Sequence, residues 1–184
     1  MPLDLEIPAR KLFDEETSIV TNVPATKLRL EHSLVSISKW EAKYKKPFIS
    51  DRPEHKKTKE ETIDYIRFMT ITQNVDPNVY LVLTPKNIED ISNYIEDPMT
   101  ASFVYDDSKK KGPKEQVTSE LIYWWMTSLQ IPWEAQKWHL NRLLMLIRIG
   151  SVKSQPEEKK SKAEILARNR ALNEARKKKF NTKG

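Results

Sequence analysis

The sequence contains no cysteine and only three glycines, and these absences exclude several classes of protein. Without cysteine there are no disulfides, no thiolate metal ligands and no thiol nucleophile. Gly112, Gly150 and Gly184 lie far apart, whereas phosphate-binding loops need several glycines close together. No stretch approaches 18 consecutive apolar residues, and residues 1–10 lack an apolar segment of signal-peptide length. We therefore expect a soluble protein without a nucleotide-binding loop, a membrane span or a targeting signal.

The net charge of +6 over 184 residues is unevenly distributed along the chain. Residues 1–152 hold 21 basic and 22 acidic residues, whereas residues 153–184 hold 11 basic and 4 acidic ones. The body is therefore nearly neutral, and the excess positive charge lies in the tail. This distribution argues against nucleic-acid binding by the body and confines it to the tail.

Side-chain patterns that mark catalytic or metal sites are missing. The three histidines, His32, His55 and His139, form no H-x-x-x-H pair, and no G-x-S-x-G motif occurs. Acidic pairs lie next to expected helix ends or loops, where carboxylates interact with solvent and with the helix dipole. We predict that the protein is not an enzyme and that it needs no cofactor or metal. We interpret His32 and His139 as structural residues.

The first 30 residues carry the strand signals of the chain. Leu3, Leu5 and Ile7 alternate with acidic residues, and residues 18–21 and 27–30 show further strand patterns. We predict two or three short strands, in a hairpin or small sheet, for a region 1–30 that packs on the body.

The helical domain is expected over residues 31–150, which makes the fold class mainly α. Expected helices run over 31–44 and from about 59 to 70, the second beginning at a capping box formed by Thr58 and Glu61. Thr84-Pro85 predicts another helix start, with Ile88, Ile91 and Ile95 on one face. Gly150 is expected to end the last helix of the domain.

Four of the five tryptophans lie between residues 118 and 149. Apolar spacing there predicts a helical hairpin that restarts at Pro132, and we expect it to be the centre of the core. Trp138 and Leu143 are predicted core residues. Three consecutive aromatic residues, Tyr123 to Trp125, cannot all face one core, because successive helical residues are separated by 100°. At least one should therefore reach an edge or an interface.

Residues 151–184 are predicted to form a linker followed by a basic helix. The helix has a thin apolar face, so we expect it to become ordered on binding a partner. Partner-binding residues are predicted on the tryptophan segment and on this tail, namely Trp124, Trp133, Ile165, Arg168, Leu172 and Arg176.

Several sequence blocks resemble a family of small proteins from tailed bacteriophages. The block Lys137-Trp138-His139-Leu140-Asn141-Arg142-Leu143-Leu144 is the strongest, and the others are residues 30–41, 46–48, 94–95, 99–101, 120–126 and 168–176. The family looks like the tail assembly chaperones encoded upstream of the tape measure protein. The resemblance covers about residues 28–184 and includes no catalytic residues.

The resemblance implies binding to the tape measure protein, and possible further partners are the tail tube protein and a second copy of the chain. It also implies a location in the cytoplasm of the infected bacterium and absence from the mature virion. Two alternatives stay open: a minor virion structural protein, such as a tail connector or completion subunit, and a nucleic-acid-binding regulator acting through the basic tail.

Overall fold

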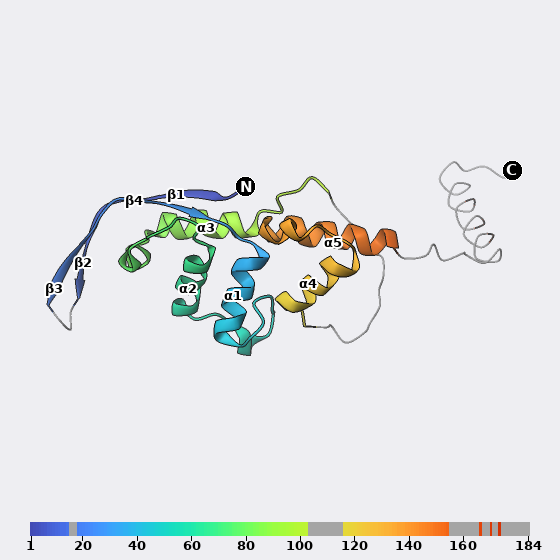
Figure 1. The fold of residues 1–184 in the computed structure, drawn as a ribbon, viewed down its shortest axis with the longest axis horizontal. Coiled ribbons are helices and arrows are strands. Elements are labelled where there is room, and N and C mark those ends of the chain that lie inside the picture. The colour runs from blue at the N-terminus through green and yellow to red at the C-terminus, as the bar shows by residue number, and fades with distance from the viewer. Residues whose placement is uncertain (15–17, 103–115, 155–165, 167–169, 171–172, 174–184) are drawn as a thin grey trace. The chain divides into compact units, whose positions relative to one another are not determined.

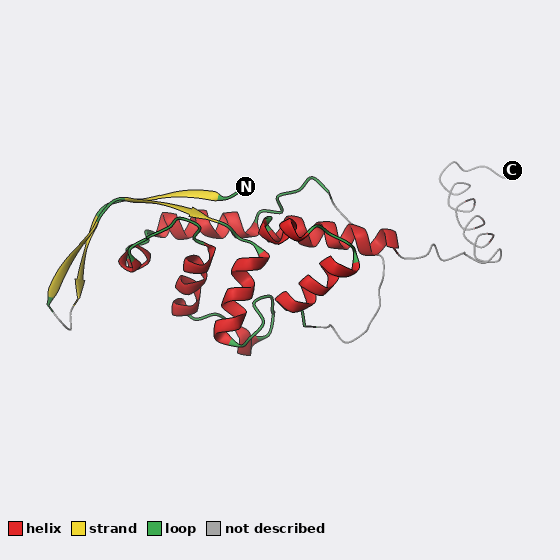
Figure 2. Cartoon of the chain, viewed as in Figure 1, coloured by secondary structure: helices red, strands yellow, loops and turns green. Residues whose placement is uncertain are grey.

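A computed structural model describes residues 1–14, 18–102 and 116–154, together with the single helical positions 166, 170 and 173. The chain divides into two compact units, Met1–Ser151 and Val152–Gly184. The described residues consist of helices with N-terminal antiparallel strands, 54% helical and 14% strand, as the sequence predicts at this level (Figure 2).

The four strands form one long two-stranded ribbon. β1 (Leu3–Ile7) pairs with β4 (Thr26–Leu30), and β2 (Arg10–Asp14) pairs with β3 (Ile19–Val23), all antiparallel. The register continues without insertion across the two Pro-Ala dipeptides at positions 8–9 and 24–25 that interrupt the ladder. Proline has no amide hydrogen to donate, which explains the break. The sequence patterns predicted strands at β1, β3 and β4 but missed β2.

The β1–β4 part of the ribbon buries one face and exposes the other. Leu5, Ile7, Leu28 and Leu30 are buried, while the alternating residues form exposed ion pairs, such as Lys27 with Glu6 at 2.7 Å. The free edge of β4 continues to pair with the segment after the second helix: the Glu31 amide donates to the Met69 carbonyl at 2.7 Å. The β1–β4 half of the ribbon is thereby attached to the helical body.

The first two α-helices begin and end close to the predicted residues. α1 spans Leu34–Tyr44 and α2 spans Lys59–Met69, and the two helices pack side by side (Figure 1). The predicted capping box is present: the Glu61 amide donates to Thr58 Oγ1, and the Thr58 amide donates to the Glu61 carboxylate. A short 3-10 helix, η1 (Pro53–His55), lies in the connection between α1 and α2.

The third helix follows another 3-10 turn. η2 (Pro77–Leu81) precedes α3 (Pro85–Glu96), whose N-cap is the predicted Thr84. α3 lies along β1, and Asn87 Nδ2 donates to the Glu6 carbonyl at 3.2 Å. Of the three isoleucines predicted to share one face of this helix, Ile91 is buried and Ile95 partly buried, whereas Ile88 is exposed.

The tryptophan segment differs from the predicted hairpin. α4 (Ser119–Ser128) is followed by the 3-10 helix η3 (Trp133–Lys137), and α5 starts only at Leu140 and runs to Ser154. Pro132 therefore starts a 3-10 turn and not the second helix. Gly150 does not cap α5 but lies inside it. A Cβ at this position would be 3.0 Å from Leu129 Cδ1. The glycine permits close packing of the α5 backbone against Leu129.

The tryptophan at the centre of the core is Trp40 of α1, not one of the four in the later segment. Its side chain is fully buried, together with Leu30, Leu34, Ile37, Met69, Ile122, Met126 and Leu143. Leu143 was predicted correctly as a core residue. Trp138 was not, because it follows η3 in extended conformation and is 37% exposed.

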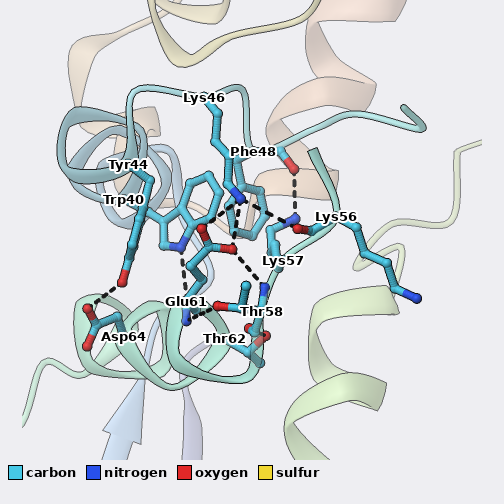
Figure 3. A network of polar contacts seen from close by, with 10 residues as sticks. All are labelled: Trp40, Tyr44, Lys46, Phe48, Lys56, Lys57, Thr58, Glu61, Thr62 and Asp64. Atoms are coloured by element: carbon cyan, nitrogen blue, oxygen red, sulfur yellow. Dashed lines mark hydrogen bonds and ion pairs between the residues drawn. The ribbon is translucent and has the colours of Figure 1, made fainter. Parts of the chain in front are cut away.

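Polar contacts from α2 and the preceding loop hold Trp40 in place (Figure 3). Trp40 Nε1 donates to the Glu61 carbonyl at 2.9 Å, which satisfies the buried indole N–H. Lys46 pairs with the Glu61 carboxylate at 2.7 Å. The Lys57 ammonium lies 3.8 Å from the Phe48 ring centroid and donates to the Phe48 carbonyl at 2.8 Å. Burial lowers the pKa of Lys57, while the hydrogen bond from Lys46 lowers the pKa of Glu61.

A buried carboxylate connects α1 to the start of α4. One Glu41 oxygen accepts hydrogen bonds from the Ser119 amide, at 2.7 Å, and from the Ser119 hydroxyl. The other oxygen accepts from the Phe48 amide at 2.7 Å. Because helix N-termini carry partial positive charge and unpaired amides, this arrangement stabilises an otherwise costly buried charge.

Deleting residues 155–184 should lower the melting temperature by only a few degrees, corresponding to about 1 kcal/mol. The buried apolar side chains of the described residues all precede Gly150, and Leu166 in the tail is exposed. Thermal unfolding followed by circular dichroism measures the change. An aggregated or unfolded truncated protein would show that the tail is an integral part of the core.

Candidate protein-binding surface

Trp124 lies on the side of α4 that faces away from the core. α4 buries Ile122 and Met126, and a residue two positions from either is rotated by about 200° around the helix. The side chain of Trp124 is accordingly 62% exposed. The expectation that one of the three consecutive aromatic residues would leave the core is therefore confirmed, and that residue is Trp124.

Trp133 is held on the surface by contacts to α4. The 3-10 geometry of η3 buries Ala135 completely and leaves Trp133 54% exposed. Its ring stacks on Tyr123 at a centroid distance of 5.0 Å, and Tyr123 Oη donates to Gln136 Oε1 at 3.1 Å. A stacked aromatic pair has few accessible rotamers, so little conformational entropy is lost when a partner covers it. We refer to Tyr123, Trp124 and Trp133 as the tryptophan surface.

Trp138 borders a separate cleft of about 300 Å³. The cleft is lined by Tyr94, Met99, Lys137, Trp138 and Arg142, among others. The Arg142 guanidinium lies 4.8 Å from the Trp138 ring centroid, a cation–π contact. Trp138 thus combines an exposed apolar ring with neighbouring positive charge, although the sequence placed it in the core.

The structure describes the predicted partner-binding residues of the tryptophan segment but not those of the tail. Trp124 and Trp133 both occupy exposed positions on the α4–η3 segment. Ile165, Arg168, Leu172 and Arg176 lie outside the described residues, so their roles stay predictions. Tyr123 belongs to the run of three aromatic residues noted in the sequence but was not among the predicted partner-binding residues, and its stacking on Trp133 is visible only in the structure.

The histidines occupy structural positions in the body. His32 Nδ1 and the Tyr65 hydroxyl share a hydrogen bond of 2.6 Å, and His139 Nε2 donates to the Tyr94 carbonyl at 2.8 Å. Their rings lie 5.0 Å apart at the centroids. Burial, together with the neighbouring His139, lowers the pKa of His32 to about 3, and burial also lowers the pKa of His139. Both rings are therefore neutral near pH 7.

The His32 backbone joins two further parts of the fold. Its amide donates to Tyr94 Oη of α3 at 3.3 Å, and its carbonyl accepts from the Leu140 amide of α5 at 2.9 Å. These contacts account for the burial of the strand–helix junction. They agree with the interpretation of His32 and His139 as structural residues.

Within the described ranges, no three His, Asp or Glu side chains gather in a way that would hold a metal ion. None of the helices described is both long and apolar enough to cross a membrane. Comparison with protein-family models, with curated proteins and with solved structures gives no match. The tryptophan surface is therefore the feature from which a function can be argued, and its geometry suits contact with another protein.

Proposed function

We propose that this chain is a bacteriophage tail assembly chaperone that binds the tape measure protein through its tryptophan surface. The observation that carries the proposal is the exposure of Trp124 and Trp133 on the α4–η3 segment, while Trp40 fills the core. Tryptophan is enriched among residues that dominate binding energy at protein interfaces. The choice of partner rests on the sequence blocks that resemble the phage family.

The chemistry of the surface fits an apolar stripe on a helix. A tape measure protein is a long helical chain whose apolar stripes would aggregate before assembly. Exposed indole rings can pack against such a stripe, as aromatic residues do where an amphipathic helix binds a partner. Release must follow during tail assembly, so each contact is expected to be weak, with several copies acting along one partner. The basic C-terminal helix is proposed as a second contact region.

Replacing both Trp124 and Trp133 by alanine should weaken binding to the tape measure protein at least tenfold, which corresponds to about 1.4 kcal/mol. The melting temperature should change little, because neither ring belongs to the core. Isothermal titration calorimetry with purified tape measure segments measures the affinity. Leu81→Ala is the matched control, since it removes an exposed apolar side chain from η2 and should leave the affinity unchanged.

The same experiment contradicts the proposal if the double variant binds as tightly as the original chain. A further check is the composition of purified virions, from which a chaperone is absent. If the protein is present there in fixed copy number, the surface is a permanent contact of a connector or completion subunit.

A further inference from the structure

The β2–β3 half of the ribbon extends past the helices with both of its edges unpaired (Figure 1). Within the described part of the chain, no hydrogen bond to the backbone of Arg10–Val23 exists apart from those of the β2–β3 ladder. Unpaired edges offer a row of amide and carbonyl groups to another strand. We refer to this half of the ribbon as the arm.

The arm also exposes large apolar side chains. Phe13 and Ile19 are each 58% exposed and Val20 is 53% exposed, and Phe13 lies directly opposite Val20 in the ladder. An isolated two-stranded ribbon is at best marginally stable in water, and three or more strands are needed for stability. The arm therefore has the features of a strand pair that gains stability from additional strands.

The two edges of the arm differ in charge. β3 reads Ile-Val-Thr-Asn-Val and carries no charged residue, whereas β1, β2 and β4 each carry at least two. Charged residues normally protect edge strands against pairing, and β3 lacks this protection. Three of its residues, Ile19, Val20 and Thr21, are β-branched and exposed or partly exposed, which favours strand pairing.

We propose that β3 pairs in antiparallel fashion with β3 of a second copy of this chain, centred on Thr21. The product is a four-stranded sheet in which the two β3 strands are central and the two β2 strands form the edges. In this register Thr21 faces its own counterpart, Ile19 faces Val23, and Val20 faces Asn22. Directly opposed threonines and β-branched pairs are favourable cross-strand neighbours.

Charge selects this pairing over the alternatives. A charged residue in a strand that pairs with β3 would lose part of its hydration, which is costly. Among the described strands, β3 alone carries no charge, so a second β3 is the partner that avoids this cost. Pairing through β2 would bring Arg10 and Lys11 of both copies into the seam. The twofold arrangement also closes on itself, so it produces a dimer and not a filament.

The size of the seam predicts a weak dimer. Each copy contributes a strand of five residues, whereas stable interfaces use about 20–30 residues per partner. The dimer is therefore concentration-dependent, and many copies gathered on one partner would promote it.

Cysteine cross-linking tests the register directly, because the chain has no cysteine of its own. Thr21→Cys places the two thiols opposite each other across the twofold axis, where the Cβ atoms of paired residues lie about 5 Å apart. Oxidation with copper phenanthroline should yield a disulfide-linked dimer on a non-reducing gel. Leu12→Cys is the matched control, since Leu12 lies opposite Thr21 within its own arm. Its counterpart would be about 14 Å away, three strand spacings, and should cross-link at least tenfold less.

A second variant tests the seam without a covalent bond. Thr21→Lys places two positive charges face to face and should shift the monomer–dimer equilibrium at least tenfold toward monomer in sedimentation equilibrium, with an unchanged melting temperature. Cross-linking at Leu12 as strong as at Thr21 would overturn the proposal in favour of the β2 edge. A chain that is monomeric at the highest concentrations, without cross-linking at Thr21, would overturn self-pairing and leave a strand from another protein as the partner.

Discussion

Replacing Trp40 by alanine should destabilise the protein by about 4 kcal/mol, enough to unfold a large fraction of a typical domain. The side chain is fully buried at the contact of α1 with α2, so its removal leaves a cavity that neighbouring residues cannot fill completely. It also leaves the Glu61 carbonyl without its indole donor and removes the ring beside Lys46 and Lys57. Chemical denaturation followed by circular dichroism measures the loss.

Trp133→Ala is the matched control for Trp40→Ala. Both substitutions remove an indole, but Trp133 is half exposed and touches the fold mainly through Tyr123. We expect a loss below about 1 kcal/mol for Trp133, as for other surface substitutions. Equal losses for the two variants would show that the α4–η3 segment is as important to the core as α1.

Lowering the pH from 7 to 5 should reduce the free energy of unfolding by about 2 kcal/mol through His32 alone. The pKa of His32 is about 3 in the folded protein, below the value of about 6.5 expected for the unfolded chain. The unfolded state therefore binds the proton more readily. The contribution of the neutral His32 ring to the free energy of unfolding is fully present above pH 6.5 and is lost as the pH falls from there toward 3. His139, whose pKa is also lowered by burial, acts in the same direction.

His32→Gln provides the control for this pH dependence. Glutamine can still accept from the Tyr65 hydroxyl but does not titrate, so the loss between pH 7 and pH 5 should shrink by about 2 kcal/mol. Urea unfolding at the two pH values measures the difference. The hydrogen bond from Lys46 lowers the pKa of Glu61, but its contribution is lost mainly below this window, because an unfolded glutamate titrates at about pH 4.3. The same pH dependence in the variant would assign the effect to other groups.

Local signals in the sequence predicted much of the secondary structure. The Thr58–Glu61 capping box and the Thr84-Pro85 start are present because their hydrogen bonds form within one helical turn. The alternation of Leu3, Leu5 and Ile7 predicted β1 because a strand with one buried face has an apolar residue at every second position. β2 was missed because Arg10-Lys11 and Leu12-Phe13 do not alternate, and its strand conformation depends on pairing with β3.

Burial of individual aromatic residues could not be predicted from spacing. Periodicity placed the later tryptophans on amphipathic segments, but a period does not state which face meets the rest of the protein. That choice depends on contacts between distant segments, such as the hydrogen bond of Glu41 with Ser119 at the start of α4, two residues 78 positions apart in sequence. The buried Trp40 likewise donates its indole N–H to a carbonyl of α2, another contact between distant segments.

The sequence by itself therefore determined the positions of the capped helices, the strand character of the N-terminal region and the near-neutral charge of the body. These properties depend on neighbouring residues, on periodicity or on composition alone. Only the tertiary structure decided that Trp40 is core while Trp124 and Trp133 are surface, that Gly150 lies inside α5, and that β3 forms an uncharged free edge. Each of these depends on which distant segments approach one another, because burial and edge pairing are properties of packed elements.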